Sequence, residues 1–240
     1  MHSCPICINQ FSNFLPIPEQ YVRQLNSLQV PYSLDEFETL NIAQYLCPVC
    51  GATDRDRLYA LFYKLIFSER FSGPKRILDI APSKPLSWFL RNQPDVTYLS
   101  GDLNSELADE QVDICDMRQF DNSSFDFIVC SHVLEHVEDD RQAMRELLRV
   151  LSPLGRAILM VPILLTANDI DEDPFEFRIS ERWRRFGQDD HVRMYNRDTF
   201  LGRLGDEKWK ITEFKVADFN EDTLRVNGVS NHSVLYVGGH

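Results

Sequence analysis

The chain has 240 residues, 43% of them hydrophobic, and a net charge of −12. This length and composition suffice for one sizeable core, and sixteen Phe argue against disorder. The acidic balance argues against a nucleic-acid partner, because proteins that bind phosphate backbones usually present a basic face. The N-terminus lacks the pattern of a signal peptide, and no apolar run reaches membrane-spanning length. We therefore expect a soluble, cytoplasmic protein with neither a nucleic-acid nor a membrane partner.

The first motif in the chain is a pair of C-x-x-C knuckles: "CPIC" supplies Cys4 and Cys7, and "CPVCG" supplies Cys47, Cys50 and Gly51. Cysteines of a cytoplasmic protein are metal ligands or buried thiols more often than disulfides. Two knuckles bring four thiolates to one centre, as tetrahedral zinc prefers, and a site closed by four cysteines is structural rather than catalytic. Gly51 suits the tight turn of the second knuckle. The alternative is two unrelated redox or core pairs.

The segment between the knuckles, residues 8–46, is longer than the usual zinc-ribbon spacing and has room for a short helix. We expect residues 1–53 to form a four-cysteine zinc module resembling a zinc ribbon, and residues 54–240 to form a second domain. Cys115 and Cys130 fall in strand-like runs of that second domain and are expected to be buried thiols.

After the second knuckle, apolar residues recur at helical spacing, from a cap at Thr53 or Asp54 to a breaker at Gly73 and Pro74. Strand-like and helical segments then alternate, which implies right-handed crossovers and a parallel sheet. Strands are expected at 76–80, 96–102, 112–116, 125–131 and 156–162, and helices at 85–92, 139–151 and 197–204, with a turn at 152–155. Two further strand-like runs, 209–219 and 233–239, joined by a loop, would close one sheet edge as an antiparallel pair.

The loop after the first of these strands contains no glycine. Nucleotide-binding α/β domains usually place several glycines here, so that the chain turns tightly beside a cofactor. This chain has "DIAPSKP" instead, with Asp79, Ala81, Ser83, Lys84 and Pro85. Alanine and serine are small enough to let a ligand approach, and proline is tolerated in the first turn of a helix. The serine is also a suitable N-cap for that helix.

Together these motifs resemble the class I S-adenosylmethionine-dependent methyltransferases, particularly proteins that join a Cys-knuckle start to a small methyltransferase domain. The resemblance covers residues 75–162 and is closest in "SFDFIVCSHVLEHVEDDRQAMRELLRVLSPLGRAILMVP". It implies an α/β fold with a Rossmann-like, mostly parallel seven-stranded sheet and helices on both faces. It also implies S-adenosylmethionine as cofactor and an O or N nucleophile of a small molecule, such as a sugar or secondary metabolite, as methyl acceptor. The glycine-free loop motivates an alternative: a non-catalytic, zinc-containing interaction protein on a degenerate methyltransferase scaffold.

The resemblance places a cofactor site at the carboxyl ends of the strands, where open α/β sheets bind ligands. Asp102 stands where the family binds the ribose hydroxyls, which a carboxylate can accept in bidentate fashion. Asp116 and Met117 stand where it contacts adenine, Asp79 balances the cationic sulfonium, and Lys84 faces the methionine carboxylate. The expected cofactor residues are Asp79, Ala81, Ser83, Lys84, Asp102, Leu103, Asp116, Met117 and Ser131. The alternatives are turn or cap roles for Asp102 and Asp116, and a solvated surface position for Lys84.

Two histidines are candidates for a catalytic base. Methyl transfer is an in-line displacement for which the protein supplies positioning, desolvation and sometimes a base. His191, in "GQDDHVRMY", is the first candidate, and His132, in "SHVLEHV", is the second. For Glu135 and His136, we expect a structural role in anchoring the turn rather than a role in catalysis. The i, i+4 pair His132 and His136 resembles two metal ligands, but the sequence offers no third ligand nearby.

The segment 163–196 is expected to form an insertion above the cofactor site, as a roof over the substrate. It concentrates charged and aromatic residues: Arg178, Arg182, Arg184, Arg185 and Arg193, with Trp183, Phe186, Asp189 and Asp190. In an acidic protein, such an arginine cluster favours an anionic or polar acceptor such as a carboxylate, a phosphate or a sugar derivative. The alternative is ion pairing between these arginines and nearby acids.

Overall fold

The computed structural model describes residues 1–69, 75–104, 106 and 108–240; the predicted breaker at Gly73 and Pro74 lies outside them. The centre of the structure is a seven-stranded sheet in the order β10-β11-β7-β6-β3-β4-β5. Its strands are β3 (Lys75–Ile80), β4 (Val96–Asp102), β5 (Glu110–Gln111), β6 (Phe125–Ser131), β7 (Leu151–Met160), β10 (Lys210–Phe214) and β11 (Leu235–Gly239). The strands from β3 to β7 are mutually parallel, while β11 runs antiparallel to both of its neighbours. The predicted mostly parallel sheet with an antiparallel edge pair is confirmed.

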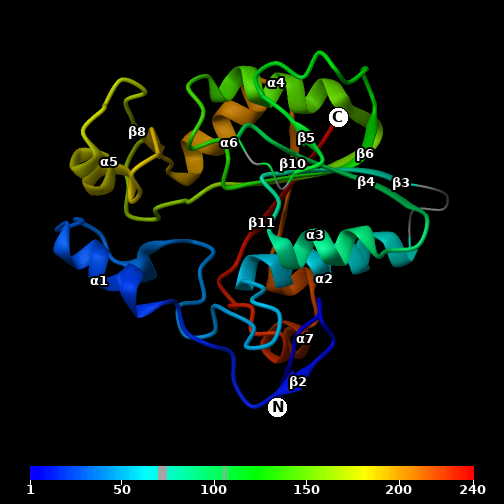
Figure 1. The fold of residues 1–240 in the computed structure, drawn as a ribbon, viewed down its shortest axis with the longest axis horizontal. Helices are drawn as coiled ribbons and strands as arrows, with labels where there is room; N and C mark the ends of the chain where they lie inside the picture. The colour runs from blue at the N-terminus through cyan, green and yellow to red at the C-terminus, as the bar shows by residue number, and fades with distance from the viewer. Residues whose placement is uncertain (70–74, 105, 107) are drawn as a thin grey trace.

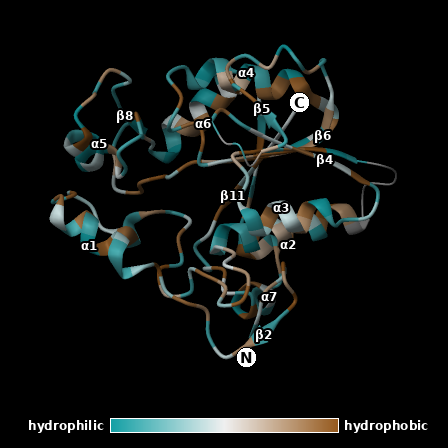
Figure 2. Ribbon diagram, in the orientation of Figure 1, coloured by the Kyte–Doolittle hydropathy of each residue, from teal (hydrophilic) through white to brown (hydrophobic). Residues whose placement is uncertain are grey.

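Helices cover both faces of this sheet, as Figure 1 shows, with α4 and α6 on one side and α2 and α3 on the other. Their bounds are α2 (Asp54–Glu69), α3 (Lys84–Arg91), α4 (Asp140–Val150) and α6 (Arg197–Asp206). The apolar residues of α4 recur on one face, so that Ala143, Met144, Leu147 and Val150 are fully buried. Figure 2 shows the resulting alternation of hydrophobic and hydrophilic residues along the helices, around a largely hydrophobic sheet.

Two of the predicted helix caps are present. The Thr53 hydroxyl accepts a hydrogen bond from the Asp56 amide at 3.2 Å, and the Asp56 carboxylate accepts one from the Thr53 amide at 2.8 Å. Ser83 caps α3 by accepting a hydrogen bond from the Leu86 amide at 3.3 Å. Such caps satisfy backbone donors that the first helical turn leaves free, and each contributes about 1 kcal/mol.

Three local predictions were wrong. The segment 112–116, expected to be a strand, is a turn that follows the two-residue β5. The prediction failed because Val112 and Ile114 are both buried, at the spacing of strand residues, although the chain bends here. The turn expected at 152–155 lies within β7, whose register against β6 shifts there. The connection from β10 to β11 carries a 3-10 helix (Val216–Asp218) and the short helix α7 (Glu221–Val226) instead of a plain loop.

The N-terminal segment and the insertion contribute short elements of their own. The first knuckle lies between β1 (His2–Ser3) and β2 (Gln10–Phe11), and α1 (Glu19–Ser27) and a 3-10 helix (Leu34–Glu36) lie between the knuckles. The insertion contains β8 (Asp171–Glu172), α5 (Ile179–Phe186) and β9 (Arg193–Met194). One hydrophobic core runs from Cys4 and Phe14 to the central sheet. Within the described ranges, no helix is long and apolar enough to cross a membrane.

The buried side chain of Arg57 joins the N-terminal segment to the C-terminal one. Its guanidinium donates hydrogen bonds to five backbone carbonyls, those of Gln44, Tyr45, Ala52, Asn227 and Gly228. It also lies 3.9 Å from the centre of the Phe14 ring. The chain can approach this closely at Gly228 because glycine has no Cβ. A Cβ at this position would lie 2.4 Å from the Phe14 ring. A single arginine thus fixes three separate stretches of chain against one another.

Candidate functional site

The four knuckle cysteines lie together at the N-terminal end of the molecule, with their sulfur atoms within 4.8 Å of one another. The Sγ atoms of Cys4 and Cys50 are 3.7 Å apart, and those of Cys7 and Cys47 are 3.8 Å apart. Gly51 has the predicted left-handed backbone, with φ of 74°, and its amide donates to the Cys47 carbonyl at 3.0 Å. The donor set of four thiols around one centre fits tetrahedral zinc.

The two remaining cysteines differ from each other. Cys130 is completely buried in β6, as expected. Cys115 is only half-buried and lies in the turn after β5, where its thiol is 3.5 Å from the Asp139 carbonyl. The expectation of a buried strand thiol at Cys115 was wrong for the same reason as the strand itself.

The carboxyl ends of β3 and β4 present two of the predicted cofactor acids. Asp79 is 1% exposed and accepts a hydrogen bond from the Tyr98 hydroxyl at 2.7 Å. Burial raises the pKa of Asp79 to about 7, against the opposing effect of that hydrogen bond. Asp102, at the end of β4, is half-buried and accepts a hydrogen bond from the Asn104 amide at 2.9 Å. Both acids thus lie at the carboxyl end of the sheet, and their contacts to a cofactor stay predictions.

The loop after β3 keeps the conformation of a glycine loop without containing glycine. Ala81 has φ of 50°, a left-handed backbone that glycine adopts far more readily. The Ser83 hydroxyl donates to the Asp56 carboxylate at 2.7 Å, which ties the loop to α2. Lys84 is exposed on the first turn of α3. The loop therefore turns tightly after β3, and its role beside a cofactor stays a prediction.

The other predicted cofactor residues lie in varied surroundings. The hydroxyls of Ser131, at the end of β6, and Tyr59, on α2, are 2.8 Å apart, and Leu103 is 50% exposed. The Asp116 carboxylate pairs with Arg118 at 2.5 Å, and this pairing lowers the pKa of Asp116. Met117 is completely buried, so its side chain belongs to the core. Contacts from Asp116 and Met117 to adenine stay predictions.

A cavity of about 500 Å³ lies beyond the ends of β6 and β7. Its walls come from five parts of the chain: the segment between the two cysteine pairs, the first turn of α2, the turn after β6, the end of β7 with the two residues after it, and the insertion. One part of the wall is apolar and aromatic, with Tyr21, Leu25, Tyr32, Phe37, Met160, Ile163 and Phe186. Another part is polar, with Arg55, His132, Glu135, His136, Gln188 and His191.

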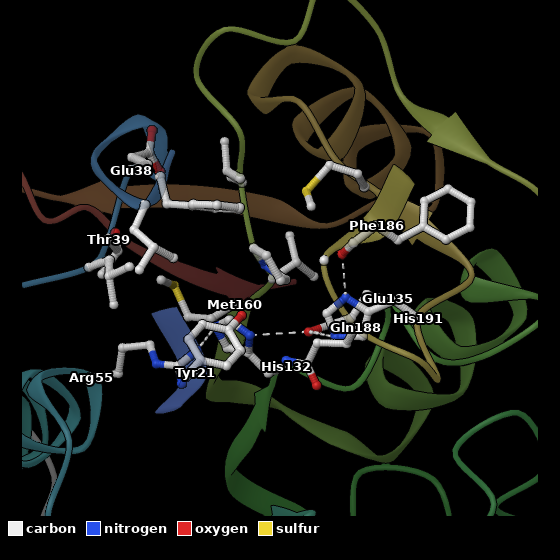
Figure 3. A pocket seen from close by; sticks show the side chains of 18 of the residues that line it. Tyr21, Glu38, Thr39, Arg55, His132, Glu135, Met160, Phe186, Gln188 and His191 are labelled. Carbon is white, nitrogen blue, oxygen red and sulfur yellow. Dashed lines mark hydrogen bonds and ion pairs between the residues drawn. The ribbon is translucent and has the colours of Figure 1, made fainter. Parts of the chain in front are cut away.

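The polar wall brings both predicted bases to the same carboxylate, as Figure 3 shows. Nδ1 of His132 lies 3.1 Å from Oε1 of Glu135, and Nε2 of His191 lies 3.9 Å from the same atom. The other ring nitrogens face different partners. Nε2 of His132 contacts the guanidinium of Arg55, and Nδ1 of His191 lies 2.9 Å from the Phe186 carbonyl oxygen. Because a guanidinium only donates, Nε2 of His132 is the acceptor in that contact.

Burial dominates the electrostatics of this cluster. Burial and the nearby Arg55 charge lower the pKa of His132 to about 4, and burial also lowers that of His191. Burial alone would raise the pKa of Glu135, but the histidines, His132 first, outweigh it and lower that pKa. The cluster therefore holds an ionised carboxylate beside neutral imidazoles. His132 is also held in a left-handed backbone conformation, with φ of 58°.

The arginines of the insertion pair with carboxylates of the insertion itself. Arg178 pairs with Glu176, Arg184 with Glu181, Arg185 with Asp173, and Arg193 with Glu172. Arg182 lies against the Glu176 carbonyl. The ion-pairing alternative is thus the one that the structure shows, and these charges give no support to an anionic acceptor.

Sequence reasoning missed Arg55 and assigned Glu135 only an anchoring role. Arg55 lies in "TDRDRLY" at the start of α2, two residues before the buried Arg57, and nothing in that run distinguishes an arginine that lines a cavity from one that holds a fold together. The importance of Glu135 depends on His191, which only the insertion brings near it.

Comparisons with known proteins agree with this geometry. Residues 88–159 match the model of a methyltransferase domain. The matched residues make up less than half of the chain. The match supports an enzyme of the methyltransferase class, and it covers the strands and helices from α3 to β7. No curated protein matches the chain.

Several solved structures are similar to this chain. The carbon methyltransferase CurJ has a TM-score of 0.50 and 14% identity, over 77% of this chain and 53% of that one. YcgJ from Bacillus subtilis has a TM-score of 0.46 and 17% identity, over 72% and 95% of the two chains. Phosphoethanolamine N-methyltransferase 2 from Haemonchus contortus, solved with S-adenosyl-L-methionine, has a TM-score of 0.49 and 13% identity, over 79% and 53%. At 14% identity, the likeness to CurJ shows a shared Rossmann-like fold and nothing more.

Proposed function

We propose that this protein transfers a methyl group from S-adenosylmethionine to an O or N nucleophile of a small molecule. The observation that carries the proposal is the methyltransferase domain of residues 88–159, whose strand ends present Asp102 and whose β6 opens onto a ligand-sized cavity. A cavity of about 500 Å³ falls within the usual range for small-molecule sites. A degenerate scaffold would have no use for a cavity lined by ionisable side chains, and the Ala81 loop keeps the turn of a cofactor loop.

The cofactor would supply an electrophilic methyl group on a sulfonium, and this chain's residues would bind and orient it. We propose that Asp102 holds the ribose hydroxyls, that Asp79 balances the positive charge, and that the loop of Ala81 and Ser83 lies against the methionine part. We also propose Lys84, Leu103, Asp116, Met117 and Ser131 as the remaining contacts. The knuckle cysteines would hold a structural zinc ion outside this chemistry.

The acceptor would occupy the cavity, with the insertion 163–196 and the segment between the cysteine pairs as its walls. Its nucleophile would face the polar wall, where His191 and His132 are the proposed bases. His191 is the better placed of the two, because Nε2 of His132 already accepts from Arg55. The apolar wall suits an acceptor with an apolar or aromatic body.

Calorimetric titration with S-adenosylmethionine and S-adenosylhomocysteine tests the proposal directly. Both should bind with one site per chain, and mass spectrometry of the purified protein should detect a co-purifying adenosyl ligand. A folded protein that binds neither compound would contradict the proposal.

Replacing Asp102 with Ala should weaken S-adenosylmethionine binding about 10- to 100-fold, because a charged hydrogen-bonding partner of the ribose contributes about 1.5–3 kcal/mol. Asp102→Asn keeps an oxygen for the Asn104 amide and should weaken binding without disturbing the turn. Asp121→Ala is the matched control and should bind normally, because this exposed acid precedes the amino end of β6 while Asp102 lies at the carboxyl end of β4. Unchanged calorimetric affinity in Asp102→Ala would refute the role of this residue.

Cofactor affinity should rise with pH between 5.5 and 7. The pKa of the buried Asp79 is about 7, so its carboxyl group is neutral at lower pH and becomes charged as the pH rises. A cationic ligand binds better to the ionised form, so affinity should rise by up to about tenfold per pH unit in this window. Asp79→Asn should remove the dependence, and titration calorimetry at several pH values measures it. S-adenosylhomocysteine, which lacks the sulfonium charge, should respond less.

A further inference from the structure

The polar wall of the cavity contains a group of potential metal ligands that differs from the predicted histidine pair. Glu135, His136 and His191 each place one ligand atom within 4.8 Å of the other two. Glu135 and His136 lie in the turn after β6, and His191 lies in the insertion, just before β9. The chain therefore supplies from a distant segment the third ligand that the sequence around His136 lacks.

Two members of this group are buried and each has a polar atom without a hydrogen-bonding partner. Glu135 is completely buried; its Oε1 lies 3.1 Å from Nδ1 of His132, while its Oε2 has no partner among the residues that the structure describes. Nε2 of His191, which is 2% exposed, has no hydrogen-bonding partner in the same part of the chain. A buried charge without compensation costs several kcal/mol, so buried charges are usually paired or coordinate metals.

The hydrogen bonding of His191 leaves a lone pair facing the carboxylate. Nδ1 of its ring lies 2.9 Å from the Phe186 carbonyl oxygen, which can only accept, so Nδ1 carries the proton. Nε2 is then an unprotonated acceptor, 3.9 Å from Oε1 of Glu135. Two acceptors face each other at a distance too long for a hydrogen bond. A cation between them satisfies both.

Neighbouring groups orient the ligands as they do around metal ions. Nδ1 of His136 lies 3.3 Å from the Asp190 carboxylate, which leaves Nε2 as a lone pair. The Phe186 carbonyl does the same for His191. Metal-binding histidines usually donate a hydrogen bond from their second ring nitrogen to a carboxylate or a backbone carbonyl in this way. The His136 and His191 rings meet edge to face, with centres 4.6 Å apart.

The backbone around the group is held rigidly. Arg193, 1% exposed, donates to the carbonyls of Leu134, Val137 and Glu138, and so clamps the turn that carries two of the ligands. The Val192 amide donates to the Glu135 carbonyl at 2.9 Å, which links this turn to the chain beside His191. A site needs such support if its ligands are to converge without a large entropic cost on binding.

We propose that Glu135, His136 and His191 bind a divalent first-row transition-metal cation at the wall of the cavity. Two imidazoles and one carboxylate suit Mn²⁺, Fe²⁺, Co²⁺ or Zn²⁺ and leave coordination positions open toward the cavity. The site rests on the proposed function and changes one part of it: with the His191 lone pair bound to the cation, His191 is a ligand and not a base, and the cation would coordinate the acceptor's nucleophile in its place. Its test is metal binding, so the site and the methyl transfer can each fail alone.

Cobalt titration of the zinc-loaded protein tests the site. After passage over a chelating resin, the full-length protein should bind one further Co²⁺ per chain, measured by calorimetry and visible absorption. The new absorption bands should lack the strong thiolate charge transfer that Co²⁺ at the cysteine site would give. Co²⁺ should also raise the thermal unfolding temperature, because it binds only the folded chain.

Glu135→Gln should lower Co²⁺ affinity at least about tenfold and remove the thermal shift. The matched control is Glu138→Gln, an exposed carboxylate in the same turn, which should bind as the native protein does. If Glu135→Gln fails to fold, His136→Gln, at a half-exposed position, should show the same loss. The proposal is overturned if Co²⁺, Mn²⁺, Ni²⁺ and Zn²⁺ all fail to bind beyond the cysteine site, or if the ligand variants bind as well as Glu138→Gln.

Discussion

Replacing Cys47 with Ser is expected to abolish zinc binding and to unfold the segment between the two knuckles. Structural zinc sites contribute about 10–16 kcal/mol of apparent binding free energy, which matches or exceeds the whole stability of a typical domain, about 5–15 kcal/mol. Cys47 is 2% exposed and lies in the same core as the central sheet. The loss of zinc should therefore lower the unfolding temperature of the entire chain.

The effect should extend to the cavity. Residues of the segment between the knuckles, including Tyr21, Tyr32 and Phe37, form much of its apolar wall. Cys47→Ser should accordingly lose acceptor binding even where cofactor binding survives. This links the proposed zinc site to substrate recognition through packing alone.

Metal analysis and thermal unfolding check this prediction together. The native protein should contain at least one zinc per chain, and a strong chelator should lower its unfolding temperature reversibly. Cys115→Ser, which replaces a half-buried thiol in a turn, is the matched control and should keep both zinc and stability. A chain that purifies without zinc and unfolds at the same temperature with or without the metal would contradict the prediction.

The sheet and the cluster of four knuckle cysteines could be predicted because their signals are local. Alternation of apolar strands with amphipathic helices determines a parallel sheet, and the strand predictions at 76–80, 96–102 and 125–131 agree with the structure to within one residue. Two C-x-x-C pairs likewise identify a four-ligand site by spacing alone. The Ser83 cap depends on three consecutive residues and was also predictable.

The polar wall of the cavity could not be predicted in full, because it depends on which distant side chains meet. His132, Glu135 and His136 were visible as a motif, but the approach of His191 depends on the path of the insertion. The same limit applies to the arginines of the insertion: a sequence gives their number, while their partners, such as Glu172 for Arg193, depend on tertiary packing. The strand prediction at 112–116 failed for a different reason, because buried residues can alternate with exposed ones in turns as well as in strands.

Replacing Arg57 with Met is expected to destabilise the protein by about 3–5 kcal/mol, near the upper end of single-substitution effects. Methionine approximates the length of the side chain but donates no hydrogen bond. Five backbone carbonyls would lose their donor, and three of them, those of Ala52, Asn227 and Gly228, accept buried hydrogen bonds. Unsatisfied buried acceptors carry a desolvation cost that apolar packing does not offset.

Urea unfolding of Arg57→Met measures this cost, with Arg225→Ala as the matched control. Arg225 forms an exposed ion pair with Asp222 on α7, and such pairs contribute at most about 1 kcal/mol. Gly228→Ala offers an independent check, since its new Cβ would lie 3.1 Å from Nη2 of Arg57 and 2.4 Å from Phe14. Should Arg57→Met unfold at the same urea concentration as Arg225→Ala, the five carbonyls would have to be satisfied by other donors, and the N-terminal segment would not depend on this arginine for its attachment to the sheet.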